Sequence, residues 1–436
     1  MATREDREAA GIFDVSDNGA TGNPNDNQTD AVWVTLMRLW HSLRPRATLR
    51  FPAGTYRVNL TITAQAHMTG IAIEGAGIDS TLLVMDPSVA TQSGTWSLEE
   101  GNWVNSLEPS LTGSTISTAH DWDTIQSVVP RNAFVVCSII GNTACSLYTR
   151  NITIKKNTQD FGNPSAGHHG LRNATPGKTI MSNTRLANFY AGCRMDWGPP
   201  PPPINLYPLG RYPVPQPRPQ KFVARNCKFE DMLGYCANGD GSYTLINPTF
   251  LRIGYGTIPA EIGRCIYLKR VNYVLLKGAL FNDCFGVALQ FDNDHDTGEE
   301  PAFSWGGSVI DVLDCDFSDY NGGDPQAADV IVSAINNPVQ WNIKGNTFTG
   351  SGNMKWYKTG GLTFENNSVT NMGVYVNINV TPASSITPKF INNDFYGCLL
   401  NIRSYGLLTQ DNLFSSTPRT VVVDSEWVSN NDTIIP

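Results

Sequence analysis

The chain has 436 residues and a formal net charge of -8 at pH 7, and only 16% of its residues are charged. This acidic balance argues against nucleic acid as the main partner, because a phosphate backbone requires a basic stripe. The 39 Gly and 27 Pro are typical of turns and short strands rather than of long helices.

The start of the chain shows no secretory signal, because residues 1–8 are mostly charged and lead into no apolar stretch. No segment is long and apolar enough to span a membrane, so we expect no membrane insertion. Such a start fits a protein made in a cytoplasm and released without secretion, as virion proteins of phage tails are. A secreted, extracellular protein whose signal peptide has been removed is the alternative.

An amphipathic helix is the first predicted element. Asp30 is its expected N-cap, and apolar residues recur on one face at helical spacing, so the helix is suited to covering an exposed apolar end. Residues 49–58 then read as a strand, a Pro/Gly turn and a second strand, and further strands are predicted at 71–77 and 81–84. The apolar residues of the helix are Ala31, Val32, Leu36, Leu39, Trp40 and Leu43.

A Pro-rich segment at residues 198–220 contains ten prolines, which cannot donate backbone hydrogen bonds to a sheet. We expect a rigid surface excursion there, or a wall of a groove or subunit contact.

A degenerate phrase recurs from about residue 222 to the end, in which Asn or Asp precedes an apolar anchor by two or three positions. One turn of such a repeat cannot bury its apolar side alone, so successive turns stack around a continuous core. Asn suits the corners because it tolerates a left-handed backbone, and stacked amides can hydrogen-bond between turns. An antiparallel sandwich is the structural alternative. The anchors are Phe229, Phe250, Phe281, Phe317, Phe348, Val369, Phe395 and Phe414, and the last turn is expected at residues 420–424.

The nine cysteines are odd in number and none is spaced like zinc ligands or a redox pair. We expect buried, reduced side chains that act as small hydrophobes. They are Cys137, Cys145, Cys193, Cys227, Cys236, Cys265, Cys284, Cys315 and Cys398.

Four segments resemble the N-terminal signature of the pectate-lyase-like superfamily: Gly11–Gly22, Gln28–Ala31, Phe51–Tyr56 and Ile73–Gly77. The resemblance implies an all-β fold, a right-handed parallel β-helix (solenoid) with an N-terminal capping helix. Members include polysaccharide lyases, glycoside hydrolases, epimerases and phage tailspike depolymerases. The paired aspartates and Gly-His-Gly of polygalacturonases and the pectate-lyase Arg motif are not found. We expect an N-terminal segment with the helix at 1–45 and the β-helix at 46–436.

Outward side chains on neighbouring rungs, about 4.8 Å apart, form a ladder suited to a sugar chain. If Val287, Leu289 and Phe291 point inward, then Gln290 and Asp292 point outward. The residues expected to bind the substrate are Tyr267, Lys269, Gln290 and Trp305.

An acidic cluster follows this strand, and glycoside hydrolysis requires two carboxylates, about 5–5.5 Å apart for retention or 6.5–9.5 Å for inversion. Asp292 and Asp294, or one of them with Asp240, are the candidate catalytic residues. A solvated turn, or a calcium site in the Asp292–Asp296 loop, is the alternative. No other cofactor is expected.

A lyase reading uses Tyr267 or Lys269 as the base against a uronic acid, with Lys269 and Arg264 neutralising its carboxylate. Hydrolysis is the preferred hypothesis. The sequence therefore predicts a homotrimeric, phage tailspike-like receptor-binding protein that associates with other tail proteins and binds and depolymerises a bacterial surface polysaccharide. The alternatives are a secreted bacterial or fungal lyase or hydrolase, and a non-catalytic carbohydrate-binding or structural β-helix.

Overall fold

The computed structural model of the chain divides into two compact units, unit 1 (residues 1–200) and unit 2 (residues 201–436). Within the described part of the chain, no helix has the length and apolar character to cross a membrane. The Pro-rich segment predicted at 198–220 lies outside the described residues. The structure describes residues 2–64, 67–90, 95–99, 102–106, 133–137, 144–157, 169–173, 175, 177–195, 221–254, 263–292, 309–320, 329–334, 339–350, 352–357, 361–377, 387–423 and 427–436.

The predicted helix is present as α2 (Thr29–His41), and it packs on the first strands of unit 1. Asp30 is not its N-cap, contrary to the prediction, because the helix begins at Thr29, whose N–H and hydroxyl donate to the Asn27 side chain at 3.0 and 2.7 Å. Leu43 lies beyond the helix and is exposed, so it does not extend the apolar face. Four of the predicted face residues are buried, namely Val32, Leu36, Leu39 and Trp40.

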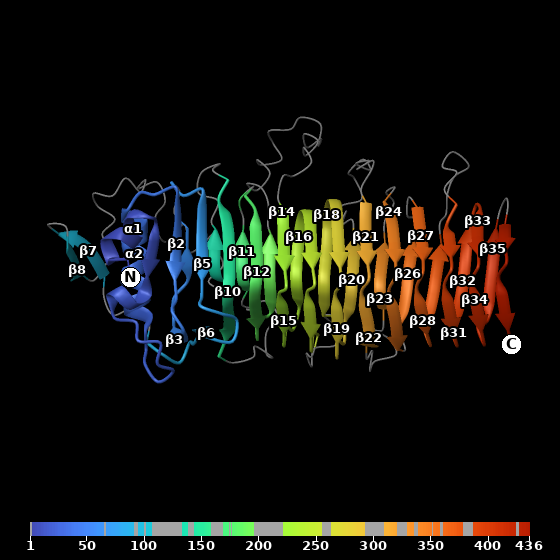
Figure 1. Ribbon diagram of the computed structural model, residues 1–436, viewed down its shortest axis with the longest axis horizontal. Coiled ribbons are helices and arrows are strands. Elements are labelled where there is room, and N and C mark those ends of the chain that lie inside the picture. Colours follow the sequence, from blue (N-terminus) through green and yellow to red (C-terminus); the bar gives the residue numbers. More distant parts are fainter. Residues whose placement is uncertain are drawn as a thin grey trace, which may run out of the picture. The chain divides into compact units, whose positions relative to one another are not determined.

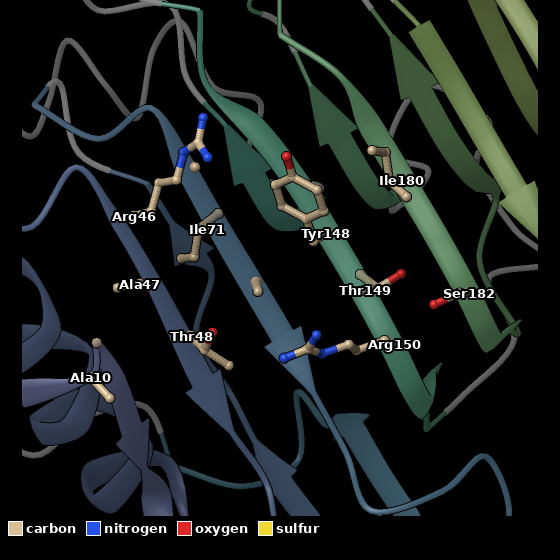
Figure 2. A pocket seen from close by; sticks show the side chains of 13 residues that line it. Ala10, Arg46, Ala47, Thr48, Ile71, Tyr148, Thr149, Arg150, Ile180 and Ser182 are labelled. Atoms are coloured by element: carbon tan, nitrogen blue, oxygen red, sulfur yellow. The ribbon is translucent and has the colours of Figure 1, made fainter. Parts of the chain in front are cut away.

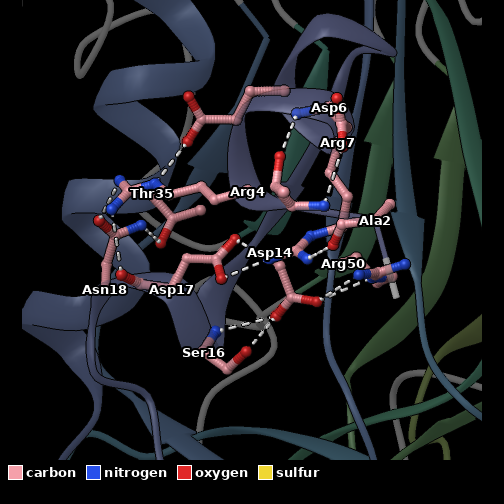
Figure 3. Close-up of polar contacts among 12 residues, drawn as sticks. Ala2, Arg4, Asp6, Arg7, Asp14, Ser16, Asp17, Asn18, Thr35 and Arg50 are labelled. Carbon is pink, nitrogen blue, oxygen red and sulfur yellow. Dashed lines mark hydrogen bonds and ion pairs between the residues drawn. The ribbon is translucent and has the colours of Figure 1, made fainter.

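A second helix that the composition does not predict, α1 (Arg4–Ala9), precedes β1 (Ile12–Asp14) and a 3-10 turn at Val15–Asn18. Three of its charged residues, Arg4, Arg7 and Glu8, form ion pairs. Arg7 bridges to Asp17 at 2.7 Å, as Figure 3 shows. This pairing fixes the charged start of the chain against the 3-10 turn.

Unit 1 continues as a coil whose turns contribute strands to three faces, and strands within each face pair in parallel (Figure 1). The first face contains β2 (Arg46–Arg50), β5 (Gly70–Glu74) and the first halves of β10 (Ser146–Lys156) and β12 (Thr179–Ala187). The second contains β3 (Gly54–Val58), β6 (Thr81–Met85) and the second halves of β10 and β12. The third contains β4 (Ile62–Thr63), β9 (Ala133–Cys137), β11 (His169–Asn173) and β13 (Ala191–Met195), while β7 (Thr95–Glu99) and β8 (Asn102–Ser106) form an antiparallel hairpin.

The signature glycines of unit 1 permit backbone contacts that a side chain would block. Gly22 and Gly54 both have positive φ, and a Cβ on Gly54 would lie 2.7 Å from the Gly22 Cα. A Cβ on Gly75 would lie 2.3 Å from the Asn151 carbonyl oxygen. Beside them, burial and the Asp14 carboxylate raise the pKa of the Tyr56 hydroxyl to about 12. The signature therefore marks the places where successive turns touch through backbone.

Unit 2 repeats the same three-faced parallel coil. The first face contains β14 (Lys221–Arg225), parts of β16 (Tyr235–Ile246) and β18 (Arg264–Lys277), β21 (Val309–Leu313), β24 (Gln340–Lys344), β27 (Gly361–Glu365), β30 (Lys389–Ile391), β33 (Leu407–Gln410) and β36 (Trp427–Asn430). The second contains β15 (Lys228–Glu230), β17 (Thr249–Leu251), β19 (Leu280–Asn282), β22 (Asp316–Tyr320), β25 (Thr347–Gly350), β28 (Ser368–Thr370), β31 (Asp394–Tyr396), β34 (Leu413–Ser415) and β37 (Thr433–Ile435). The third contains the first parts of β16 and β18, then β20 (Val287–Asp292), β23 (Asp329–Ala334), β26 (Asn353–Tyr357), β29 (Gly373–Asn377), β32 (Leu399–Ser404) and β35 (Arg419–Val423).

The Asn-rich phrase marks the corner where each turn of unit 2 enters the second face, and it contains two adjacent positions. The first position has a left-handed backbone, with φ between 51° and 68°, as predicted for a corner. It is occupied by Asn226, Asn247, Gly278, Asp314, Gly345, Asn366, Asn392, Asp411 and Asn431.

The second corner position points inward and carries a ladder of amides. Asn346 donates to Asn367 at 3.0 Å, and Asn367 donates to Asn393 at 3.0 Å. Asn393 donates to Asn412 at 2.9 Å, and Asn412 donates to the Asp432 carboxylate at 2.9 Å. The prediction of hydrogen-bonded stacked amides is confirmed. The Asn or Asp of the sequence repeat stands at the left-handed first position in some turns and at the inward second position in others.

The predicted anchors form the core of unit 2. All eight are buried, and four of them stack with ring centroids 4.4–4.7 Å apart, namely Phe250, Phe281, Phe317 and Phe348. Each buried phenylalanine contributes about 1.5–3 kcal/mol by burial, with a further 0.5–1.5 kcal/mol for aromatic contacts. Repetition of the anchor therefore stabilises the stack.

The prediction of a right-handed parallel β-helix is confirmed, and the antiparallel sandwich is excluded by the parallel pairing in each unit. The last turn is not at residues 420–424, because β36 and β37 continue the coil beyond it. The prediction for cysteine is confirmed for the eight described thiols, which are free and buried. Burial raises the pKa of the Cys265 and Cys284 thiols well above the ordinary range, so they stay protonated.

Candidate functional site

The predicted site lies on the third face of unit 2, where β16, β18 and β20 form consecutive rungs. Asn238, Tyr267 and Gln290 share one register position on these rungs. The three inward residues predicted for β20 are at most 4% exposed, and Gln290 between them is half-buried. The burial of these three residues and the partial exposure of Gln290 fit the predicted alternation, whereas Ala288 is also buried and the Asp292 side chain lies outside the described residues. Tyr267 and Gln290, two of the predicted sugar contacts, are neighbours about 4.8 Å apart along the stack.

Tyr267 does not present an open ring, because two residues cover it. The Tyr235 ring stacks on it with centroids 5.5 Å apart and planes 14° apart. The Arg264 guanidinium lies 4.7 Å from the Tyr267 ring centroid, within cation–π range. Only 8% of Tyr267 is exposed as a result, so a sugar on this face would contact the whole cluster rather than this ring alone.

The arginine of this cluster is held in place by neutral groups. Its Nε donates to the Gln290 side-chain oxygen, and its guanidinium contacts the Tyr235 hydroxyl at 3.4 Å. Among the residues that the structure describes, no carboxylate forms an ion pair with Arg264. The cluster of Tyr235, Arg264, Tyr267 and Gln290, called the Arg264 cluster below, thus presents a positioned positive charge.

Three of the predicted polar residues occupy neighbouring positions in the backbone. Gly239, Leu268 and Phe291 pair across β16, β18 and β20, and the residues that follow them are Asp240, Lys269 and Asp292. Between Gly239 and Gly241 the register shifts, because one residue of β16, Asp240, lies opposite two residues of β18, Lys269 and Arg270. The two candidate carboxylates therefore belong to rungs on either side of Lys269.

The remaining predicted residues, Asp294 and Trp305, lie outside the described residues, as do positions 293–296 of the proposed calcium loop. Only the backbone is described for Asp240, Lys269 and Asp292. Across the described ranges, no group of three or more His, Cys, Asp or Glu side chains is arranged to hold a metal ion.

Tyr235 is the member of the Arg264 cluster that the sequence analysis misses. A signal for it is present, because Tyr235-Cys236-Ala237 and Arg264-Cys265-Ile266 place Cys and an apolar residue at matching positions of consecutive rungs. Aligning the rungs on these cysteines would have placed Tyr235 beside Arg264.

No protein-family model matches the chain, and no curated protein matches it. Solved structures similar to it include the A-module of mannuronan C-5 epimerase AlgE6 from Azotobacter vinelandii, with 10% identity over 97% of this chain and 99% of that one (TM-score 0.46). An exopolygalacturonase from Thermotoga maritima has 9% identity over 97% and 91% (TM-score 0.40). Tailspike protein 3 of bacteriophage CBA120 has 10% identity over 98% of this chain and 62% of its own (TM-score 0.35).

Proposed function

We propose that this protein binds an acidic polysaccharide along the third face of unit 2 and hydrolyses it there. The observation that carries the proposal is the Arg264 cluster. A guanidinium fixed by Gln290 and two tyrosines is suited to a carboxylate on a sugar, because its geometry is set before the ligand arrives. The low charge content and acidic balance of the chain make a nucleic-acid ligand a poor alternative.

The rungs on either side of Lys269 supply the carboxylates for hydrolysis. Asp240 and Asp292 are two rungs apart, a backbone spacing of about 10 Å at about 4.8 Å per rung. This spacing favours the inverting mechanism, which needs about 6.5–9.5 Å between carboxyl groups to admit a water. One residue protonates the glycosidic oxygen while the other removes a proton from the attacking water. Asp294 is the alternative partner of Asp292.

A lyase mechanism is the second candidate, and the charge of Arg264, which no carboxylate among the described residues neutralises, favours it specifically. In a β-elimination, a base removes the proton beside the uronate carboxylate, the glycosidic oxygen leaves, and a double bond forms in the sugar. Lys269 or Tyr267 would act as the base, and Arg264 would stabilise the charge that develops on the carboxylate.

A panel of capsular and O-antigen polysaccharides tests both mechanisms. Hydrolysis yields shorter chains without new ultraviolet absorbance, whereas elimination yields products that absorb as unsaturated uronates. We expect Asp292→Asn or Asp240→Asn to lower the rate of cleavage by about a hundredfold or more. Asp394→Asn, which removes an exposed carboxylate from the second face, serves as the matched control. Full activity in Asp240→Asn, Asp292→Asn and Asp294→Asn would contradict the hydrolytic site.

We propose further that the protein acts at the surface of a phage particle, as a homotrimeric receptor-binding tailspike. The N-terminal signature and the sugar-binding ladder support this role. Analytical ultracentrifugation of the full chain should give the mass of three chains, and a monomer at micromolar concentration would contradict it.

A further inference from the structure

A depression of about 390 Å³ crosses the first face of unit 1. At about 30 Å³ per water molecule it has the volume of about a dozen waters, which is more than a single ion needs. Figure 2 shows Arg46 and Tyr148 on either side of β5 toward one end, and the Arg150 side chain reaching over β5 at the other. We call this depression the Arg46 trough. Its main lining residues are Arg46, Thr48, Gly70, Ala72, Tyr148 and Arg150.

The trough exists because β5 places its two smallest residues between larger ones. Gly70 pairs with Arg46 on one side, and Ala72 pairs with Thr48 and with Tyr148. A Cβ on Gly70 would lie 3.5 Å from the Arg46 Cγ and from the Tyr148 Cε2. The floor is thus backbone and one methyl group, and a methyl group added at Gly70 would contact both walls.

Among the described arginines around the trough, Arg46 differs from Arg50 and Arg150 in having no carboxylate partner. Arg50 pairs with Asp14, and Arg150 pairs with Glu74, both at 2.7 Å. Arg46 is exposed, and no carboxylate within the described part of the chain pairs with it. In a chain of net charge -8, this site is locally suited to an anion.

We infer that the Arg46 trough binds an acidic sugar residue, a uronate within an oligosaccharide. Arg46 would receive the carboxylate in a bidentate pair, and the ring would lie on Ala72 against the Tyr148 side chain. The Thr48 hydroxyl and the Arg150–Glu74 pair offer partners for the sugar hydroxyls. The Glu74 carboxylate disfavours a dianion, so a singly charged sugar fits better than a phosphate group.

This site is separate from the Arg264 cluster, and it needs no catalytic group. It would let unit 1 hold an acidic glycan whether or not unit 2 cleaves one. Each rung advances by about 4.8 Å, so β2, β5, β10 and β12 together offer a ladder on which more than one sugar can lie.

Calorimetric titration of the full-length protein tests this inference. The probes are tetragalacturonate, tetraglucuronate and tetramannuronate, each compared with its fully methyl-esterified form, which keeps the sugar and removes the charge. We expect at least one uronate to bind, and Arg46→Gln to weaken it about tenfold, as does the ester. Ala72→Leu fills the trough and should weaken binding of the same probe while the circular dichroism spectrum is unchanged. Lys389→Gln, an exposed cation on the first face of unit 2, is the matched control.

Three outcomes would overturn the inference. In the first, no uronate binds. In the second, the ester binds as tightly as the acid. In the third, Arg46→Gln and Ala72→Leu both retain wild-type affinity; loss of affinity in Arg264→Gln alone would then locate binding on unit 2. Failure of the cleavage assay leaves these results unaffected, so the two proposals fail separately.

Discussion

The two units secure the ends of their second face with different polar groups. In unit 1, the buried Asp86 carboxylate receives hydrogen bonds from Arg57 at 2.8 Å and from Asn157 at 3.0 Å, which joins three turns through one charge. In unit 2, the opposite end of the second face, where each turn enters it, is linked by neutral amides that repeat from Asn346 to Asn412 and end in Asp432. A neutral amide link can be repeated on every added turn, whereas the buried Asp86 carboxylate joins only the turns that contact it.

The largest expected effect is on the amide ladder. Asn393→Ala removes a side chain that donates to Asn412 and to the Phe364 carbonyl, and that accepts from Asn367. Because the partners stay buried without hydrogen bonds, we expect a loss of about 3 kcal/mol in the free energy of unfolding. Urea denaturation with hydrogen exchange should show the loss in unit 2.

The neighbouring residue supplies the control for this prediction. Asn392→Gly keeps the left-handed corner and removes only an exposed amide, so it should cost less than about 1 kcal/mol. Equal losses in the two variants would show that the corner backbone, rather than the buried ladder, provides the stability.

The next largest effect is expected from acid, which should destabilise the turns around Asp86 in unit 1. Burial raises the pKa of Asp86, but hydrogen bonds from Ser88, Arg57 and Asn157 outweigh burial and lower it below its usual value near 3.8. Its contribution to stability is therefore complete above the unfolded pKa and is lost as pH falls through the lower, folded pKa. Hydrogen exchange between pH 6 and 2.5 should show progressive opening around β3, β6 and β10, and Asp86→Asn should remove this pH dependence.

In unit 2, lowering the pH should destabilise only the end of the amide ladder, at Asp432. Burial raises the pKa of Asp432, and hydrogen bonds from Ser429, Thr409 and Asn412 lower it overall. Acid should therefore loosen the turn of β37 first and leave the amides of Asn346 and Asn367 protected. Simultaneous opening of the whole ladder would contradict the contrast between charged and neutral links.

The smallest expected effect is at the Arg264 cluster. Tyr235→Phe keeps the stack on Tyr267 and removes the long hydroxyl contact to Arg264, so affinity for an acidic oligosaccharide should change less than about twofold. Tyr235→Ala removes the stack as well and should weaken binding about fivefold, by the usual worth of aromatic and cation–π contacts. Equal affinities in both variants would show that the stack does not position Arg264.

Prediction succeeded where the sequence repeats and failed where a contact occurs once. The anchors and the inward residues of β20 follow from periodicity, because each turn buries its apolar side chains at the same positions. The N-cap of α2 was misplaced because the helix begins before Asp30, at Thr29, whose N–H donates to the Asn27 side chain. The stacking of the Tyr235 ring on Tyr267 was not predicted, because Tyr235 lies 32 residues earlier in the chain.

By itself, the sequence determined the coil repeat, the capping helix, the stacked core and the reduced state of the described cysteines, because these depend on residue type and local spacing. The parallel direction of the strands was predicted from the resemblance to the pectate-lyase-like superfamily, since strand spacing alone left an antiparallel sandwich open. The tertiary structure decided which cations remain without carboxylates. Arg150 and Arg264 look alike in the sequence, yet Glu74 neutralises one across 76 positions while neutral groups hold the other. Pairing of charges across rungs depends on the register of distant strands, and it is this register that leaves Arg46 and Arg264 available for an acidic sugar.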